Sequence, residues 1–189
     1  MTTSAVPRPA AEAGERTVHV IQGQHAIVAE PNVVLSTILG SCVAACLHDP
    51  VARIGGMNHF LLPGDEGNRA GEAMKYGVNA MELLINGLLQ RGATRTRLQA
   101  KLFGGAQVVQ NLSDIGATNG AFALKFLEVE GIACVSQSLG GDRARRIRYW
   151  PESGRASQIL LEKTNREAFA AERRTQAPQK PPADDVELF

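Results

Sequence analysis

Three cysteines and four histidines are the side chains of this sequence best suited to covalent chemistry, and Cys42 stands out among them. It follows Gly40 and Ser41 at the entry to an apolar segment. Because glycine permits backbone conformations that are closed to other residues, a cysteine placed there can project from the strand end while nearby backbone N–H groups hold an oxyanion. This placement is typical of a nucleophile, although a lone cysteine in an apolar strand is also typical of core packing.

A thiol attacks at neutral pH when a neighbouring group lowers its pKa or accepts its proton, and histidine is the usual partner. His59 lies seventeen residues after Cys42, and Asp49-Pro50 between them predicts a turn joining two strands. Antiparallel pairing about that turn brings the end of the second strand beside the start of the first. This geometry makes His59 the candidate base for Cys42, while a hydrogen-bonded core histidine is the other interpretation of the same position. The other histidines lie on earlier strands or at the turn itself: His19, His25 and His48.

A metal ion is the competing use of four of these residues: Cys42, Cys46, His48 and His59. On one strand Cys42 and Cys46 would stand about 13 Å apart, at roughly 3.3 Å per residue, which a single zinc ion cannot bridge. The sequence therefore predicts no metal and no cofactor. Cys134, alone in a later apolar segment, is predicted to be a core residue.

The segments around these residues alternate between strand and helix periodicity. Short β-branched and apolar stretches predict strands over residues 17–30, 33–38, 43–47, 54–62, 98–103, 132–136, 147–150 and 157–162. Helical periodicity covers residues 72–90 and 118–130, and Gly92 stands where the first helix should end. The core face of that helix is predicted to carry Met74, Val78, Met81, Leu84, Ile85 and Leu88. We expect an α+β fold of layered, sandwich-like mixed sheets with two main helices packed on one face.

Composition restricts the class of protein further. A chain of 189 residues, with 20 Lys+Arg against 19 Asp+Glu, fits one domain without a general attraction to nucleic acid or lipid. The few cysteines, the absence of a signal-like start and the short apolar runs predict a soluble cytoplasmic protein with no membrane insertion. Residues 1–16 and 165–189 read as flexible tails flanking a domain over residues 17–164. The basic stretch before Trp150 is explained by a solvated strand edge, so no nucleic acid is expected.

The motifs together resemble one family, the chemoreceptor glutamine deamidases called CheD, of bacterial chemotaxis. Matching segments follow the family's order over about residues 20–162 and are LGSCV at 39–43, GGMNHFLLP at 55–63, KLFGGA at 101–106, Ile115-Gly116 with Asn119, and LGG at 139–141 with Arg143 and Arg146. Any one segment is weak, but five in order are specific. The resemblance also implies a fold similar to the catalytic domain of the cytotoxic necrotizing factor toxins.

The resemblance implies a protein-glutamine glutaminase, a cysteine hydrolase that converts glutamine side chains of methyl-accepting chemotaxis receptors to glutamate and releases ammonia. The family's nucleophile and base fall on Cys42 and His59. The third family residue is a threonine six positions before the cysteine, where this chain has Ser36 with Thr37 beside it. We assign the role to Ser36, with Thr37 as the alternative if the strand register slips by one.

Further roles are expected from the chemistry of this activity. The backbone around Gly40 and Ser41 is expected to hold the oxyanion, and Arg143, Arg145 and Arg146 are expected to attract the acidic surface of receptor helices. A CheC-type phosphatase is an implied partner. Two other activities stay open: an adaptation module that binds receptors or CheC with weak or no catalysis, and a receptor glutamyl methylesterase that uses the same nucleophile.

Overall fold

The computed structural model describes residues 14–62, 70–108 and 115–162. The two segments predicted to be tails therefore lie, apart from residues 14–16, outside the described residues. None of the helices in the described part of the chain is long and apolar enough to cross a membrane.

The described residues form nine strands in two sheets. The four-stranded sheet has the order β1 (Arg16–His19), β3 (Val33–Leu39), β8 (Arg145–Trp150) and β9 (Arg155–Leu160). The five-stranded sheet has the order β2 (His25–Val28), β5 (Ile54–Asn58), β4 (Val43–Asp49), β6 (Gln99–Gly104) and β7 (Ala133–Leu139). The β1–β3 and β6–β7 pairs are parallel and the other pairs are antiparallel, so both sheets are mixed.

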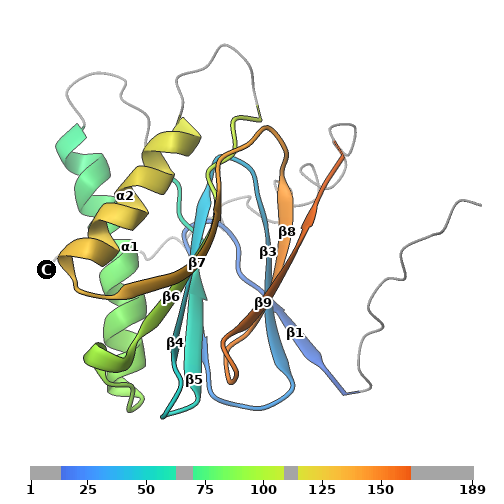
Figure 1. Cartoon of the computed structure of the whole chain (residues 1–189), viewed down its shortest axis with the longest axis vertical. Coiled ribbons are helices and arrows are strands. Elements are labelled where there is room, and N and C mark those ends of the chain that lie inside the picture. Colours follow the sequence, from blue (N-terminus) through green and yellow to red (C-terminus); the bar gives the residue numbers. More distant parts are fainter. Residues whose placement is uncertain (1–13, 63–69, 109–114, 163–189) are drawn as a thin grey trace, which may run out of the picture.

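Two helices, α1 (Ala70–Gln90) and α2 (Ile115–Val129), cover one face of the five-stranded sheet. The other face of that sheet packs against the four-stranded sheet, which gives the three layers seen in Figure 1. A 3₁₀ turn, η1 (Arg95–Arg97), precedes β6. The predicted α+β class and the placement of both helices on one face are confirmed.

The helical periodicity of α1 identifies its buried face only in part. Met81, Leu84, Ile85 and Leu88 are buried, as predicted, whereas Met74 and Val78 are exposed, so their assignment to the core is wrong. Near that end of α1 the close contact is made by Gly77 instead. A side chain there would come within 3 Å of Leu62 and Phe122, so the absence of one lets the helix approach the core closely.

The alternation of side chains along β4 divides the interior into two cores. Val43, Ala45 and Leu47 belong to the core beneath the helices, while Ala44 and Cys46 belong to the core between the sheets. Cys42 has the same parity as Ala44 and packs at the border of that second core. The strand period therefore directs Cys42 into the space between the sheets. Cys134 differs from the prediction: it is exposed, because β7 is an edge strand of its sheet.

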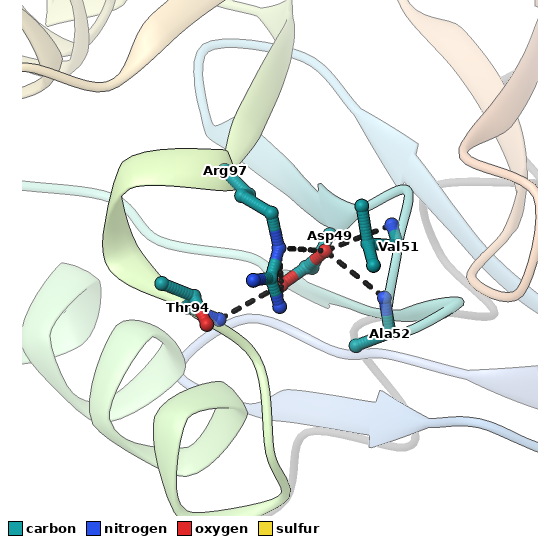
Figure 2. A network of polar contacts seen from close by, with 5 residues as sticks. All are labelled: Asp49, Val51, Ala52, Thr94 and Arg97. Carbon is teal, nitrogen blue, oxygen red and sulfur yellow. Dashed lines mark hydrogen bonds and ion pairs between the residues drawn. The ribbon is translucent and has the colours of Figure 1, made fainter.

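The predicted turn at Asp49-Pro50 is present and is held by the Asp49 carboxylate (Figure 2). This fully buried group accepts hydrogen bonds from the backbone N–H groups of Val51, Ala52 and Thr94 and from the guanidinium of Arg97. Burial opposes ionisation, but these donors outweigh it and hold the pKa of Asp49 well below its usual range. The network ties the β4–β5 turn to the segment that leads into β6.

Candidate active site

Cys42 lies where the chain crosses from one sheet to the other. β3 ends at Leu39 in the four-stranded sheet, and β4 begins at Val43 in the five-stranded sheet. The crossing is fixed by backbone hydrogen bonds, since the N–H of Ala106 donates to the carbonyl of Gly40 and the N–H of Gly105 donates to the carbonyl of Cys42, both at 2.8 Å. The glycine-rich segment after β6 therefore supports the backbone of the nucleophile candidate.

Asn119 supports the same crossing from α2. Its buried side chain donates from Nδ2 to the carbonyl of Ser41 at 2.9 Å and accepts at Oδ1 from the N–H of Leu62 at 2.8 Å. The two bonds join the residue before Cys42 to the segment after β5 that carries His59. The family motif pointed to Asn119 but did not indicate this role.

The β4–β5 register brings Cys42 and His59 together on one face. The antiparallel pairing extends to Val43 opposite Phe60, so it places His59 opposite Ala44, two residues along from Cys42 and on the same face. Diagonal neighbours of this kind have Cα atoms roughly 7–8 Å apart, within the reach of an aromatic ring. The register therefore makes Cys42 and His59 diagonal neighbours on one face, and the pairing of their side chains stays a prediction.

The imidazole of His59 is oriented by two oxygen atoms. Its Nδ1 lies 2.8 Å from Oγ1 of Thr37 and 3.3 Å from the carbonyl oxygen of Val20. Because a carbonyl can only accept, the second contact indicates that Nδ1 carries the ring proton and that Nε2 carries the lone pair. Nε2 is buried, and within the described part of the chain it has no hydrogen-bond partner.

Burial also sets the charge of this ring. His59 is 2% exposed, and burial lowers its pKa to about 4, although the contact with the Val20 carbonyl opposes the change. The imidazole is therefore neutral at neutral pH. A neutral ring with a lone pair at Nε2 is in the form that accepts a proton from a thiol.

Side chains alternate between the two faces of β3, and this alternation distinguishes Thr37 from Ser36, the two candidates for the third catalytic residue. Thr37 shares the inward parity of Leu35 and Leu39 on β3 and reaches His59, as described above. Ser36 has the opposite parity, and its hydroxyl donates to the carbonyl of Ile147 at 2.9 Å. The structure therefore gives the contact with His59 to Thr37, the alternative, and not to Ser36.

Gln22 is a neighbour of Cys42 that the sequence did not reveal. It lies between β1 and β2, and the Cys42 thiol donates to its Oε1 with an Sγ–Oε1 distance of 3.6 Å. No periodicity or motif marks this residue, because the contact joins two separate connections between strands.

The three arginines expected to meet substrate have different surroundings. Arg143 and Arg146 are exposed. Arg145 is buried, and its guanidinium donates to the carbonyls of Ser138 and Gly140 and, at 2.9 Å, to the Ser138 hydroxyl. The Arg145 side chain points inward from β8 and supports the β7–β8 turn. It therefore cannot serve as the surface charge that was predicted.

The four residues considered for metal binding do not form one cluster in the described part of the chain. His48 is remote from Cys42, and its Nε2 lies 3.1 Å from the carbonyl oxygen of Glu152. Throughout the ranges that the structure describes, no group of three or more His, Cys, Asp or Glu side chains could hold a metal ion.

Comparison with known proteins agrees with the motifs. The family model "CheD chemotactic sensory transduction" matches residues 61–158, and relatives more than 50% identical extend the similarity across Cys42 and His59. The chain belongs to the CheD family. A CheD relative from Rhizobium etli (strain CIAT 652) is 54% identical over 181 residues, which cover 94% of this chain and 98% of the relative. Another from Caulobacter vibrioides (strain NA1000 / CB15N) is 52% identical and covers 91% and 92%.

Both CheD relatives carry the name probable chemoreceptor glutamine deamidase CheD. Among solved structures, the Neisseria meningitidis protein NMB0706 of family DUF152 matches with a TM-score of 0.44 at 12% identity, over 68% of this chain and 65% of its own. The toxin domain that the resemblance implied is a different protein from this structural neighbour, and similarity to it stays a prediction.

Proposed function

We propose that this CheD protein deamidates glutamine side chains of methyl-accepting chemotaxis receptors, with Cys42 as nucleophile and His59 as base. The observation that carries the proposal is the shared face of Cys42 and His59, with the His59 ring held in the tautomer that accepts a proton at Nε2. The names of its CheD relatives supply the substrate, a glutamine of a chemoreceptor. Such a substrate implies action on the cytoplasmic part of the receptors.

The reaction uses the two groups in alternation. His59 takes the proton of Cys42, and the thiolate attacks the carboxamide carbon of the substrate. The imidazolium then protonates the departing nitrogen, which leaves as ammonia. Water, activated by the same imidazole, hydrolyses the γ-glutamyl thioester and restores the thiol. No step of this sequence calls for a cofactor.

The backbone of the crossing is suited to stabilise the tetrahedral intermediate. The carbonyls of Gly40 and Ser41 are directed to Ala106 and Asn119. In a trans peptide the N–H lies opposite the carbonyl, so the N–H groups of Ser41 and Cys42 point the other way. We assign the oxyanion site to these two N–H groups, beside the thiol.

Thr37, rather than Ser36, is proposed to orient the base. Replacing Thr37 by alanine removes the 2.8 Å contact with His59 and should lower kcat by roughly 10-fold to 100-fold, because a mobile imidazole is less often aligned with the thiol. Ser36→Ala is the matched control, since its hydroxyl bonds Ile147 instead. The measurement is kcat and KM for receptor deamidation, with Thr37→Ser expected to restore most of the rate. A larger loss from Ser36→Ala would return the role to Ser36.

The pH dependence of the reaction should reflect the buried base. With the pKa of His59 at about 4, kcat/KM should change less than about twofold between pH 7 and pH 5, whereas an ordinary histidine would lose about 25-fold over that range. Below the pKa of 4 the protonated ring cannot accept the thiol proton, and activity should be lost. The profile is measured with circular dichroism at each pH to show that the chain is folded. Half-maximal activity near pH 6.5 would contradict this assignment.

Charge near the site suits a receptor surface. Arg143 and Arg146 are exposed beside the β7–β8 turn. We propose that they attract acidic helices of the receptor. We also propose that a CheC-type phosphatase competes for the same face. A methylesterase would use the same thiol and differ only in its leaving group, and a pure binding module would need no thiol.

The proposal is tested by incubating the purified chain with purified receptor cytoplasmic domains and mapping glutamine-to-glutamate conversion by peptide mass spectrometry. Methylated receptor domains form a parallel arm for esterase action. Conversion of glutamine is the expected result. Receptor binding without conversion would favour the binding module, and demethylation without conversion would favour the esterase.

A further inference from the structure

Gln22 places a carboxamide against the thiol of the proposed nucleophile. Oε1 of its exposed side chain lies 3.6 Å from Sγ of Cys42, which donates a hydrogen bond to it. A carboxamide is the chemical group on which the proposed enzyme acts. The resting site therefore holds an internal copy of the substrate group.

The backbone around Gln22 is attached to the proposed base. The N–H of Gly23 donates to the carbonyl of His59 at 2.7 Å, and the N–H of His59 donates to the carbonyl of Gln24 at 3.0 Å. The N–H of Gln24 also donates to the carbonyl of Ile21 at 3.0 Å, which closes the turn. Because this turn is joined to His59 on both sides, the Gln22 side chain starts from a fixed place beside the base and the thiol.

We propose that Gln22 is an intramolecular substrate of Cys42 and is converted to glutamate in the course of the protein's lifetime. The inference rests on the proposed function, since it uses the same thiol and imidazole. Holding two reacting groups in one molecule raises their effective concentration, which favours reaction whenever rotation of the exposed Gln22 side chain brings Cδ within attack distance of Sγ.

The reaction balances with water as the co-reactant. The Cys42 thiolate forms a bond to Cδ of Gln22, the C–N bond breaks, and the nitrogen leaves as ammonia with the proton held by His59. Water then adds to the thioester carbon and gives a proton to the imidazole, and the C–S bond breaks to release the thiolate. The net change is glutamine plus water to glutamate plus ammonia.

The product would limit the enzyme that made it. A carboxylate at position 22 would stand beside Cys42, and a neighbouring negative charge disfavours the thiolate. Self-deamidation would therefore slow later attack on receptor glutamines. Gln22→Glu should reproduce this state and lower the rate of Cys42 alkylation at neutral pH by roughly 3-fold to 30-fold, whereas Gln22→Ala should not.

The test follows the purified full chain during incubation at neutral pH, with peptide mass spectrometry and fragmentation to separate Gln22 from Gln24. Gln24 is the matched control, because it is an exposed glutamine of the same turn. We expect a time-dependent gain of the acid form at Gln22 that is absent at Gln24 and absent in Cys42→Ala. The rate should be unchanged on dilution, since the reaction is intramolecular.

A parallel sample with receptor cytoplasmic domains separates the two proposals. If receptor glutamines are converted while Gln22 keeps its amide, the inference about Gln22 is wrong and the proposed function stands. Equal conversion of Gln22 in the wild type and in Cys42→Ala would show spontaneous chemistry and would also overturn it. Absence of both conversions would refute the proposed function and this inference together.

Discussion

Replacing Cys42 by alanine is expected to reduce receptor deamidation by roughly 10⁵-fold or more, the scale seen when a hydrolase loses its nucleophile. Without the thiol no thioester can form, and the backbone N–H groups of the crossing leave only weak residual catalysis. The measurement is the rate of glutamine-to-glutamate conversion on a receptor fragment, under single-turnover conditions. Receptor binding should be retained, because Cys42 contributes chemistry and little buried area.

Two variants make this result specific. His59→Ala should lower the same rate by roughly 10²-fold to 10⁴-fold, since it removes the base but leaves the thiol. Cys134→Ala is the matched cysteine control, because Cys134 is exposed on the edge strand β7, and its rate should stay within about twofold of the wild type. Deamidation that persists in Cys42→Ala would assign the chemistry to another group.

The largest effect on stability is expected from Asp49→Ala. The substitution leaves the N–H groups of Val51, Ala52 and Thr94 without their acceptor and removes the ion pair with Arg97. We expect the free energy of unfolding to fall by about 3 kcal/mol, because hydrogen bonds to a charged acceptor contribute roughly 1.5–3 kcal/mol each and water replaces these part-buried ones only in part. Denaturant titration measures this loss, and the melting temperature should fall by roughly 6–12 °C for a chain of this size.

The pH dependence of unfolding provides an independent check on Asp49. Its pKa is lowered in the folded protein, so the unfolded chain takes up the proton first, near the ordinary value of about 3.9. The stabilisation by Asp49 is therefore complete above about pH 5 and declines as the pH falls below that. The difference in unfolding free energy between the wild type and Asp49→Asn should shrink over the same range.

Arg97→Ala is the control for the network. It removes the guanidinium, which donates to Asp49 through Nε and Nη2, and leaves the three backbone donors in place, so its destabilisation should be smaller than that of Asp49→Ala. An equal loss in the two variants would mean that the guanidinium, and not the backbone donors, holds the turn.

The sequence alone predicted most of the strands, both helices and the register that relates Cys42 to His59. Asp49-Pro50 predicts a short turn, and a short turn between two apolar segments determines their antiparallel register. The register then brings the ends of both strands together, whatever the rest of the fold does. Gly92, which ends α1 with a positive φ of 99°, was predictable for the same local reason.

Only the tertiary structure decided which neighbours complete the site. β3 is apolar on both faces, so its sequence does not show that Thr37 faces His59 and Ser36 faces β8. The burial of Arg145 and the contact of Gln22 with Cys42 depend on how the crossing, the turns and the two sheets pack. Local spacing determines register within a hairpin, whereas contacts between distant segments depend on the packing of the layers, and periodicity does not encode that packing.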